Sequence, residues 1–181
     1  MKLQNTVLAV ALSSLISPAF ADVYCPPHPG AVTIDDNVIV TGACVLNGTQ
    51  VKGNVLVKSG GALTARDARI EGNLQADGGR FVRVNRTHVG GDIQLEGLSG
   101  EISRIQRSSI GGNLQLDSNS VRLMAEYNAI DGDLQAFSNT GGAVIRYNTI
   151  DGNLQCKSNV PAPTGGFNQV SGNKEDQCAR L

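Results

Sequence analysis

The sequence lacks tryptophan, and aromatic residues make up only 4% of its 181 residues. A globular core built on large rings is therefore not expected. The net charge of −1 gives the chain no bulk attraction to nucleic acid or to an anionic membrane. No window combines a 3.6-residue apolar stripe with helix caps. Glycine, by contrast, is abundant at 22 residues. This composition predicts an all-β protein.

Long hydrophobic runs are also absent after the first apolar stretch, Val7–Ile16. That stretch is shorter than the roughly 20 residues that a transmembrane helix needs. It is followed by Ala19-Phe20-Ala21, which has the small-x-small pattern of a cleavage site. Residues 1–21 are therefore predicted to be a signal peptide. Residues 22–181 are predicted to be a secreted or periplasmic domain without a transmembrane segment or a lipid anchor.

A six-residue phrase, Ile-Gly-Gly-Asn-Leu-Gln at 110–115, recurs with small changes along the chain. Successive copies start 17 to 21 residues apart. The eight copies start at Ile34, Val51, Ile70, Val89, Ile110, Ile130, Ile150 and Val170. A period of this length is typical of a solenoid. Apolar and polar residues alternate at the end of the phrase, which indicates a strand with one buried face.

The rest of each repeat completes a coil. The phrase's second glycine is predicted to form a bend, and the Asn or Asp after it a corner with left-handed backbone angles. A second apolar segment predicts a second strand in each repeat. The fold class is thus all-β: a single-stranded parallel β-helix, right-handed, with about seven coils of about 20 residues. Residues 22–50 would form the N-terminal cap and first coil, 51–169 the regular coils and 170–181 the C-terminal cap.

Four cysteines lie in the predicted exported domain, and an even number in an exported chain indicates two disulfides. Cys25 and Cys44 are 19 residues apart, and Cys156 and Cys178 are 22 apart. Each gap is close to one coil, so each pair would lie on adjacent turns within disulfide reach. Pairing between the two groups would have to span most of the rod. The sequence therefore predicts a disulfide cap at each end.

Stacked coils place equivalent residues about 4.8 Å apart on neighbouring strands. Amide side chains recur at equivalent positions in two rows and would form hydrogen-bonded ladders along the stack. The first row is Gln75, Gln94, Gln115, Gln135 and Gln155. The second row is Asn128, Asn148 and Asn168. We interpret both ladders as structural.

The recurring phrase resembles that of parallel β-helix proteins with short turns, and is loosely similar to bactofilin-type bacterial solenoids. The closing stretch is more specific. Its segments 152–156, 161–166 and 172–178 resemble the tail of small secreted bacterial proteins. The resemblance implies export and a β-solenoid over most of the exported domain. It carries over no catalytic residue.

Acidic residues stand seven positions after three successive starts, at Asp77, Glu96 and Asp117. A row of carboxylates could bind Ca²⁺, which takes six to eight oxygen ligands. It could also serve a carbohydrate-active enzyme, polysaccharide lyase or hydrolase-like, because glycosidases use paired carboxylates. The plainer interpretation is a solvated charged face. The nearly uniform coils leave no long loops to form a cleft, which favours a protein without catalysis and without a cofactor.

The arginines are more patterned. Arg83 and Arg86, and then Arg104 and Arg107, occupy equivalent places in successive repeats. Stacked guanidinium groups could hold carboxylates, sulfates or phosphates in bidentate fashion, for instance on an acidic polysaccharide. The alternative is an exposed face kept soluble by charge. We expect an exported, non-catalytic structural or binding module of the cell envelope or extracellular matrix. The carbohydrate-active enzyme and a self-assembling scaffold, which capped ends disfavour, are the alternatives.

Overall fold

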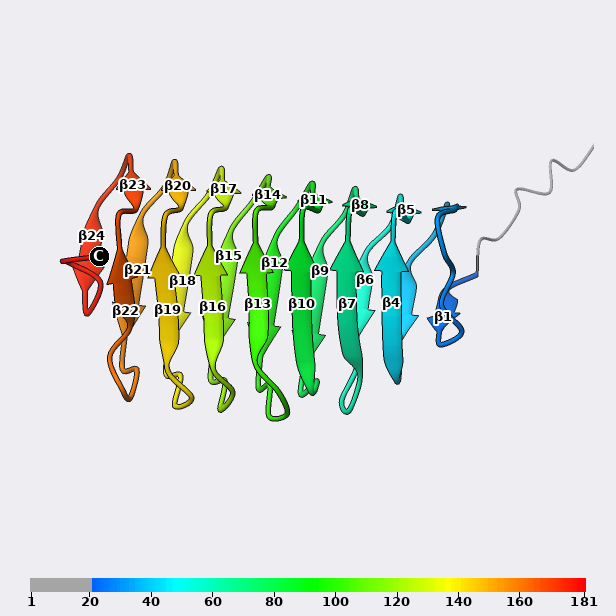
Figure 1. Cartoon of the computed structure of the whole chain (residues 1–181), viewed down its shortest axis with the longest axis horizontal. Helices are drawn as coiled ribbons and strands as arrows, with labels where there is room; N and C mark the ends of the chain where they lie inside the picture. The colour runs from blue at the N-terminus through cyan, green and yellow to red at the C-terminus, as the bar shows by residue number, and fades with distance from the viewer. Residues whose placement is uncertain (1–20) are drawn as a thin grey trace, which may run out of the picture.

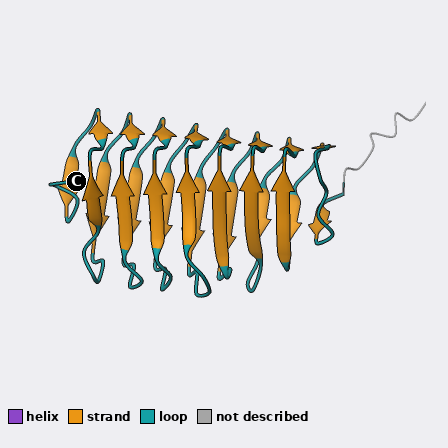
Figure 2. Ribbon diagram, viewed as in Figure 1, coloured by secondary structure: helices purple, strands orange, loops and turns teal. Residues whose placement is uncertain are grey.

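The computed structural model describes residues 21–181, in which every strand pairs in parallel and no helix occurs (Figures 1 and 2). The strands form three sheets. The nine-stranded sheet contains β1 (Val23–Cys25), β3 (Val38–Val40), β6 (Val55–Val57), β9 (Leu74–Asp77), β12 (Ile93–Glu96), β15 (Leu114–Asp117), β18 (Leu134–Phe137), β21 (Leu154–Lys157) and β24 (Lys174–Asp176). The eight-stranded sheet contains β2 (Thr33–Ile34), β5 (Gln50–Val51), β8 (Arg69–Ile70), β11 (His88–Val89), β14 (Ser109–Ile110), β17 (Ala129–Ile130), β20 (Thr149–Ile150) and β23 (Gln169–Val170). The seven-stranded sheet contains β4 (Ala43–Asn47), β7 (Ala62–Arg66), β10 (Phe81–Asn85), β13 (Ser103–Gln106), β16 (Leu123–Glu126), β19 (Ala143–Arg146) and β22 (Thr164–Gly166).

The chain winds as a right-handed parallel β-solenoid, which confirms the predicted fold class. In Figure 1 the seven-stranded sheet faces the viewer with its strands running upward, and the nine-stranded sheet lies behind with its strands running downward. The short strands of the eight-stranded sheet connect the two along the top, while the chain advances from right to left. The seven strands of the front sheet correspond to seven stacked turns.

The recurring phrase is divided between two sheets. Ile110 ends β14, and Leu114 begins β15. At the corner between them, a Cβ added to Gly112 would lie 2.2 Å from Asp92 Oδ1 of the preceding coil. Glycine at this position leaves room for the Asp92 side chain, whose Oδ1 accepts a hydrogen bond from the backbone N–H of Asn113. Each coil therefore has three strands, and the predicted two are wrong. All eight predicted starts lie in the eight-stranded sheet.

The corner residue after the glycines also differs from its prediction. The non-glycine residues with positive φ are elsewhere, for example Asp67 and Arg86 at φ 50° and 47°. The Asn or Asp of the phrase instead accepts a hydrogen bond from the next coil. The backbone N–H of Asn73 donates to Asn54 Oδ1 at 2.9 Å, and that of Asp92 donates to Asn73 Oδ1 at 2.8 Å. The side chain of one coil thus accepts a hydrogen bond from the backbone N–H of the equivalent residue in the next coil, at the corner between two sheets.

The core is a set of apolar ladders inside the coil, with a disulfide near each end. Inward-facing residues such as Ile93 and Leu114 pair in register on neighbouring strands and are completely buried. The disulfides join Cys25 to Cys44 and Cys156 to Cys178, with Cα–Cα distances of 5.5 and 5.2 Å. All four cysteines are buried in the core. The predicted pairing is confirmed.

Two ladders of asparagine run inside the solenoid. The predicted one consists of Asn128, Asn148 and Asn168. A second one, which the sequence did not predict, consists of Asn119, Asn139 and Asn159. Each Nδ2 in the two ladders donates to a backbone carbonyl of the core, as Asn139 does to Leu116 at 2.9 Å. These side chains satisfy backbone groups where the chain turns between sheets.

The predicted signal peptide lies almost entirely outside the described residues, which begin at residue 21. Within residues 21–181, no helix is present that is long and apolar enough to cross a membrane.

Candidate functional site

The four predicted arginines lie together on the outer side of the seven-stranded sheet. Arg83 of β10 and Arg104 of β13 are direct partners in the parallel register. Arg86 and Arg107 each follow the end of one of these strands, and both have left-handed backbone angles, with φ 47° and 48°. The repeat spacing is therefore sufficient to bring the four side chains to one face.

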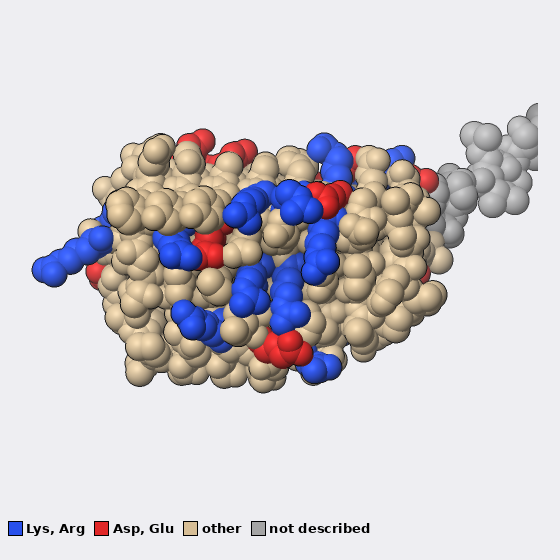
Figure 3. Space-filling model, viewed as in Figure 1, with Lys and Arg blue, Asp and Glu red and all other residues tan. Residues whose placement is uncertain are grey.

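The four predicted arginines are only part of a larger surface, which we call the arginine face. Eight arginines lie on the strands of this sheet or directly beside their ends: Arg66, Arg80, Arg83, Arg86, Arg104, Arg107, Arg122 and Arg146. Three acidic residues accompany them: Asp67, Glu101 and Glu126. Figure 3 shows the basic side chains gathered over the middle of the face. The arrangement leaves an excess of positive charge on one side of a chain whose net charge is −1.

Half of these arginines are held by carboxylates of the chain. Arg86 contacts Asp67 through two hydrogen bonds of 2.7 Å each. Arg83 Nη2 lies 2.6 Å from Glu101 Oε2, and Arg80 lies 3.7 Å from the other oxygen of the same carboxylate. Within residues 21–181, the remaining arginines apart from Arg146 form no ion pair; they are Arg66, Arg104, Arg107 and Arg122. Their guanidinium groups are available to an external anion.

Arg146 is paired with the most buried carboxylate of the face. The Glu126 side chain is only 3% exposed, and its Oε1 accepts a hydrogen bond from Arg146 Nε at 2.5 Å. Its other oxygen accepts from the amide of Gln106 on the preceding strand. The hydrogen bond to the Glu126 carboxylate raises the pKa of the Arg146 guanidinium above its ordinary value. Glu126 therefore joins three successive coils and fixes the position of one arginine.

A column of charged and aromatic residues follows the corner beside the arginine face. Arg107 lies over the ring of Tyr127 at 5.5 Å, a cation–π contact. Tyr127, Tyr147 and Phe167 then stack with ring centroids 4.9 and 5.1 Å apart and nearly parallel planes. Because each tyrosine ring is stacked on its neighbours, it presents its edge and hydroxyl to solvent rather than its face. The column holds Arg107 in place and adds hydroxyl groups to the border of the arginine face.

The pair of Arg86 and Asp67 has a measurable electrostatic signature. The hydrogen bonds from Arg86 lower the pKa of the Asp67 carboxyl below its ordinary value of 3.8. Arg86→Ala is expected to raise the pKa of Asp67 in a carbon-detected NMR titration, whereas Arg107→Ala should leave it unchanged. Because the pKa of Asp67 is lower in the folded protein than in the unfolded chain, the pair stabilises the fold fully at pH values above the ordinary pKa of the carboxyl. This stabilisation is lost as the pH falls through the pKa that Asp67 has in the folded protein. An unchanged Asp67 pKa in the Arg86 variant would contradict the pairing.

The arginine face is hollowed at two places. A hollow of about 190 Å³ is lined in part by Arg66, Arg83, Asn85 and Arg104. A wider hollow of about 590 Å³ lies at the lower ends of the strands and includes Glu101 and Arg122 among its lining residues. Arg83 and Arg104 border both. Three arginines without carboxylate partners within residues 21–181, Arg66, Arg104 and Arg122, thus line recesses that an anionic group can enter.

The acidic residues of the sequence analysis lie on a different sheet. Asp77, Glu96 and Asp117 are direct partners at the ends of β9, β12 and β15, as the repeat spacing predicts. Among residues 21–181, however, no group of three or more His, Cys, Asp or Glu side chains is arranged so that it could hold a metal ion. The calcium hypothesis therefore gains no support from their arrangement. The three carboxylates form one line along the sheet, so they do not face each other across a bond to be cleaved.

Comparisons of the chain with protein-family models, with curated proteins and with solved structures gave no match. The resemblance to bactofilin-type solenoids thus gains no support from them, and the parallel β-solenoid is what the structure itself establishes.

Proposed function

We propose that this protein is an exported, non-catalytic binding module whose arginine face engages an acidic polysaccharide of the cell envelope or extracellular matrix. One observation carries the proposal: eight arginines against three carboxylates on a single sheet of a chain with a net charge of −1. A surface kept soluble by charge alone would not need one sign concentrated on one side. Two disulfides are typical of proteins that function in oxidising compartments, which supports export.

The solenoid suits a repetitive ligand. Equivalent positions recur at the strand spacing of about 4.8 Å, so a polymer lying along the rod meets guanidinium groups at regular intervals. The guanidinium fork matches carboxylate and sulfate groups in bidentate geometry. Because the strands are fixed in a sheet, little backbone order has to be gained on binding, which lowers its entropic cost. Arg104 and Arg107 are the main contacts, since neither has a carboxylate partner within residues 21–181.

Titration with dextran sulfate, with unmodified dextran as the uncharged reference, tests the proposal. Binding of dextran sulfate is expected, with an affinity that falls as salt screens the charges. The double variant Arg104→Gln/Arg107→Gln should bind about twenty- to thirtyfold more weakly, because each exposed charge contact contributes about 1 kcal/mol and 1.4 kcal/mol is tenfold.

The matched control is Lys52→Gln/Arg69→Gln, which removes the same charge from residues outside the arginine face. It should retain nearly full affinity. Equal losses in the two double variants would mean that only net charge matters, and equal binding of dextran would remove charge recognition. Cleavage of the polymer would instead favour the carbohydrate-active enzyme. Preference for double-stranded DNA over dextran sulfate would contradict a polysaccharide ligand.

A further inference from the structure

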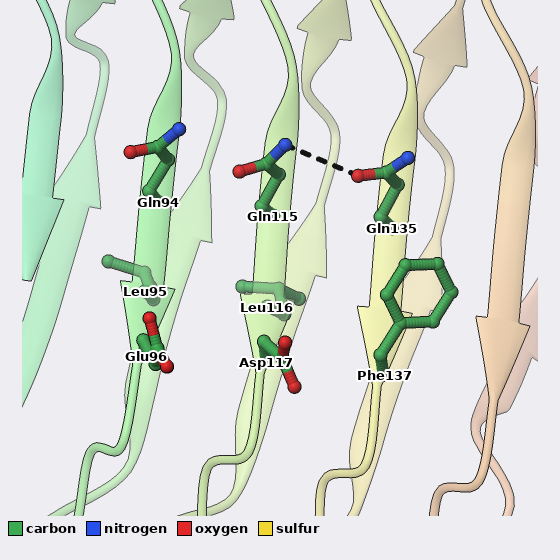
Figure 4. Close-up of a pocket in the computed structure, with 8 residues that line it drawn as sticks. All are labelled: Gln94, Leu95, Glu96, Gln115, Leu116, Asp117, Gln135 and Phe137. Atoms are coloured by element: carbon green, nitrogen blue, oxygen red, sulfur yellow. Dashed lines mark hydrogen bonds between the residues drawn. The ribbon is translucent and has the colours of Figure 1, made fainter. Parts of the chain in front are cut away.

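A second groove lies on the nine-stranded sheet, away from the arginine face. Its volume is about 320 Å³. Its two walls are rows of outward side chains from β12, β15 and β18, and its floor is formed at Leu95 and Leu116, whose side chains point inward (Figure 4). One wall is the glutamine row, with Gln94, Gln115 and Gln135. The groove thus runs across the strands, along the axis of the solenoid.

The glutamine ladder is interrupted inside this groove. Elsewhere in the row, each Nε2 donates to the next side chain, as from Gln75 to Gln94 at 2.8 Å and from Gln135 to Gln155 at 2.9 Å. Gln115 also donates to Gln135, at 3.3 Å. Between Gln94 and Gln115, both of which the structure describes, no such hydrogen bond forms, as Figure 4 shows. The Nε2 of Gln94 and the Oε1 of Gln115 are therefore a donor and an acceptor left over from the ladder.

The opposite wall has a different chemistry. Glu96 and Asp117 contribute carboxylates, which only accept hydrogen bonds when ionised. Neither forms an ion pair with a basic side chain within residues 21–181. Phe137 is the register partner of Asp117 and closes the row with a half-buried ring. The groove therefore offers several acceptors, one amide donor and one apolar ring within the width of three strands.

This combination selects a hydroxyl-rich chain. Sugar hydroxyls can donate to the two carboxylates and to Gln115, and can accept from Gln94, while the C–H groups of a sugar ring can pack against Phe137. An acidic sugar would instead place its negative charge beside the carboxylates of Glu96 and Asp117, which would repel it. We propose that the groove is a binding site for a glycan without acidic groups, lying along the solenoid axis. The two faces of the module then bind glycans of opposite charge preference, and the groove does not depend on the arginine face.

Calorimetric titration with defined hexasaccharides tests this site. The probes are cellohexaose and N-acetylchitohexaose as neutral chains, chitosan hexamer as a cationic chain and a hexamer of galacturonic acid as an acidic one. Both neutral and cationic chains lack acidic groups, so either one binding in the groove supports the proposal. The neutral chains identify hydroxyl recognition, and the cationic chain identifies pairing with the carboxylates.

Variants locate the binding. Phe137→Ala is expected to weaken binding about five- to tenfold, because an aromatic contact contributes about 1 kcal/mol. Gln94→Leu should weaken it by a similar factor through loss of the amide donor. The control Gln155→Leu changes the same ladder outside the groove and should bind like the wild type, as should Arg104→Gln/Arg107→Gln. Thermal unfolding of each variant separates a binding defect from a folding defect.

The proposal is overturned if no neutral or cationic hexamer binds at millimolar concentration, or if the acidic hexamer binds equally well in this groove. It is also overturned if a folded Phe137→Ala/Gln94→Leu variant retains wild-type affinity. Because the arginine variants leave the groove intact, failure at one face is distinguishable from failure at the other.

Discussion

Replacing Asn148 with leucine is expected to lower the free energy of unfolding by about 4 kcal/mol, although the two side chains have similar shapes. Asn148 is almost fully buried and joins three coils. Its Oδ1 accepts from both the backbone N–H and the Nδ2 of Asn128, each at 3.0 Å. Its Nδ2 donates to the carbonyl of Ala125 and to Asn168, each at 2.9 Å. Leucine would remove the acceptor of the Asn128 backbone N–H and the side-chain donor to the Ala125 carbonyl, both in the core, at about 1–3 kcal/mol for each unsatisfied group.

Urea unfolding followed by far-ultraviolet circular dichroism measures this loss. Gln155→Leu is the matched control, because it removes an amide of the same ladder type from the half-buried outer side of β21. Water can replace the lost hydrogen bonds there, so the control should change stability by less than about 1 kcal/mol. Similar losses in the two variants would mean that the buried ladder has no special role.

The position of Asn148 in the stack gives a second expectation. In a solenoid each coil contacts mainly its neighbours, so stability is a sum of coil terms and interface terms. Weakening one interface can separate the coils on its two sides into units that unfold at different urea concentrations. A broader transition with a lower slope in the Asn148 variant would show this loss of cooperativity.

The sequence predicted the stacking well because one period controls it. Eight apolar starts at nearly equal spacing allow a single register, and this register also determines the partner of Arg83 and the neighbour of Glu96. The cysteine pairs followed from the same spacing. Any property that depends only on the number of residues per coil could therefore be predicted.

Properties that depend on the path of the chain within one coil could not be predicted from the sequence. The alternation of Ile110 with Leu114 and Gln115 is compatible with one strand, and only the structure shows that a corner separates β14 from β15. The second asparagine ladder was not predicted, because asparagine is typical of turns exposed to solvent; the side chains of Asn119 and Asn139 instead point into the core and donate to backbone carbonyls there.

The candidate site was predictable to the same extent. The register places Arg104 beside Arg83, and it also places Asp67 beside Arg86, because each of these two stands three residues before its repeat start. It does not predict the pair of Arg83 and Glu101, because Glu101 lies in a connecting loop, where the lengths of the coils differ. The interruption of the glutamine ladder between Gln94 and Gln115 is also invisible in the sequence, because both residues fit the row equally well.

Removal of the two disulfides is expected to have the other large effect on stability. Each bridge closes a loop of about 20 residues, for which the chain-entropy model gives about 3 kcal/mol. The N-terminal bridge fastens β1, the first strand of the nine-stranded sheet, to Cys44 at the start of the front sheet. Without it, the first coil keeps neighbours on one side only, so it should open before the rest of the stack.

Hydrogen exchange of Cys25→Ala/Cys44→Ala tests this directly. The amides of β3 are expected to exchange about a hundredfold faster, since a loss of about 3 kcal/mol corresponds to that factor in the opening equilibrium. Those of β15, in the middle of the stack, should keep wild-type protection. Cys156→Ala/Cys178→Ala serves as the reciprocal control and should release β21 instead. Uniform loss of protection in both variants would mean that the rod unfolds as one unit and that the bridges do not act as end caps.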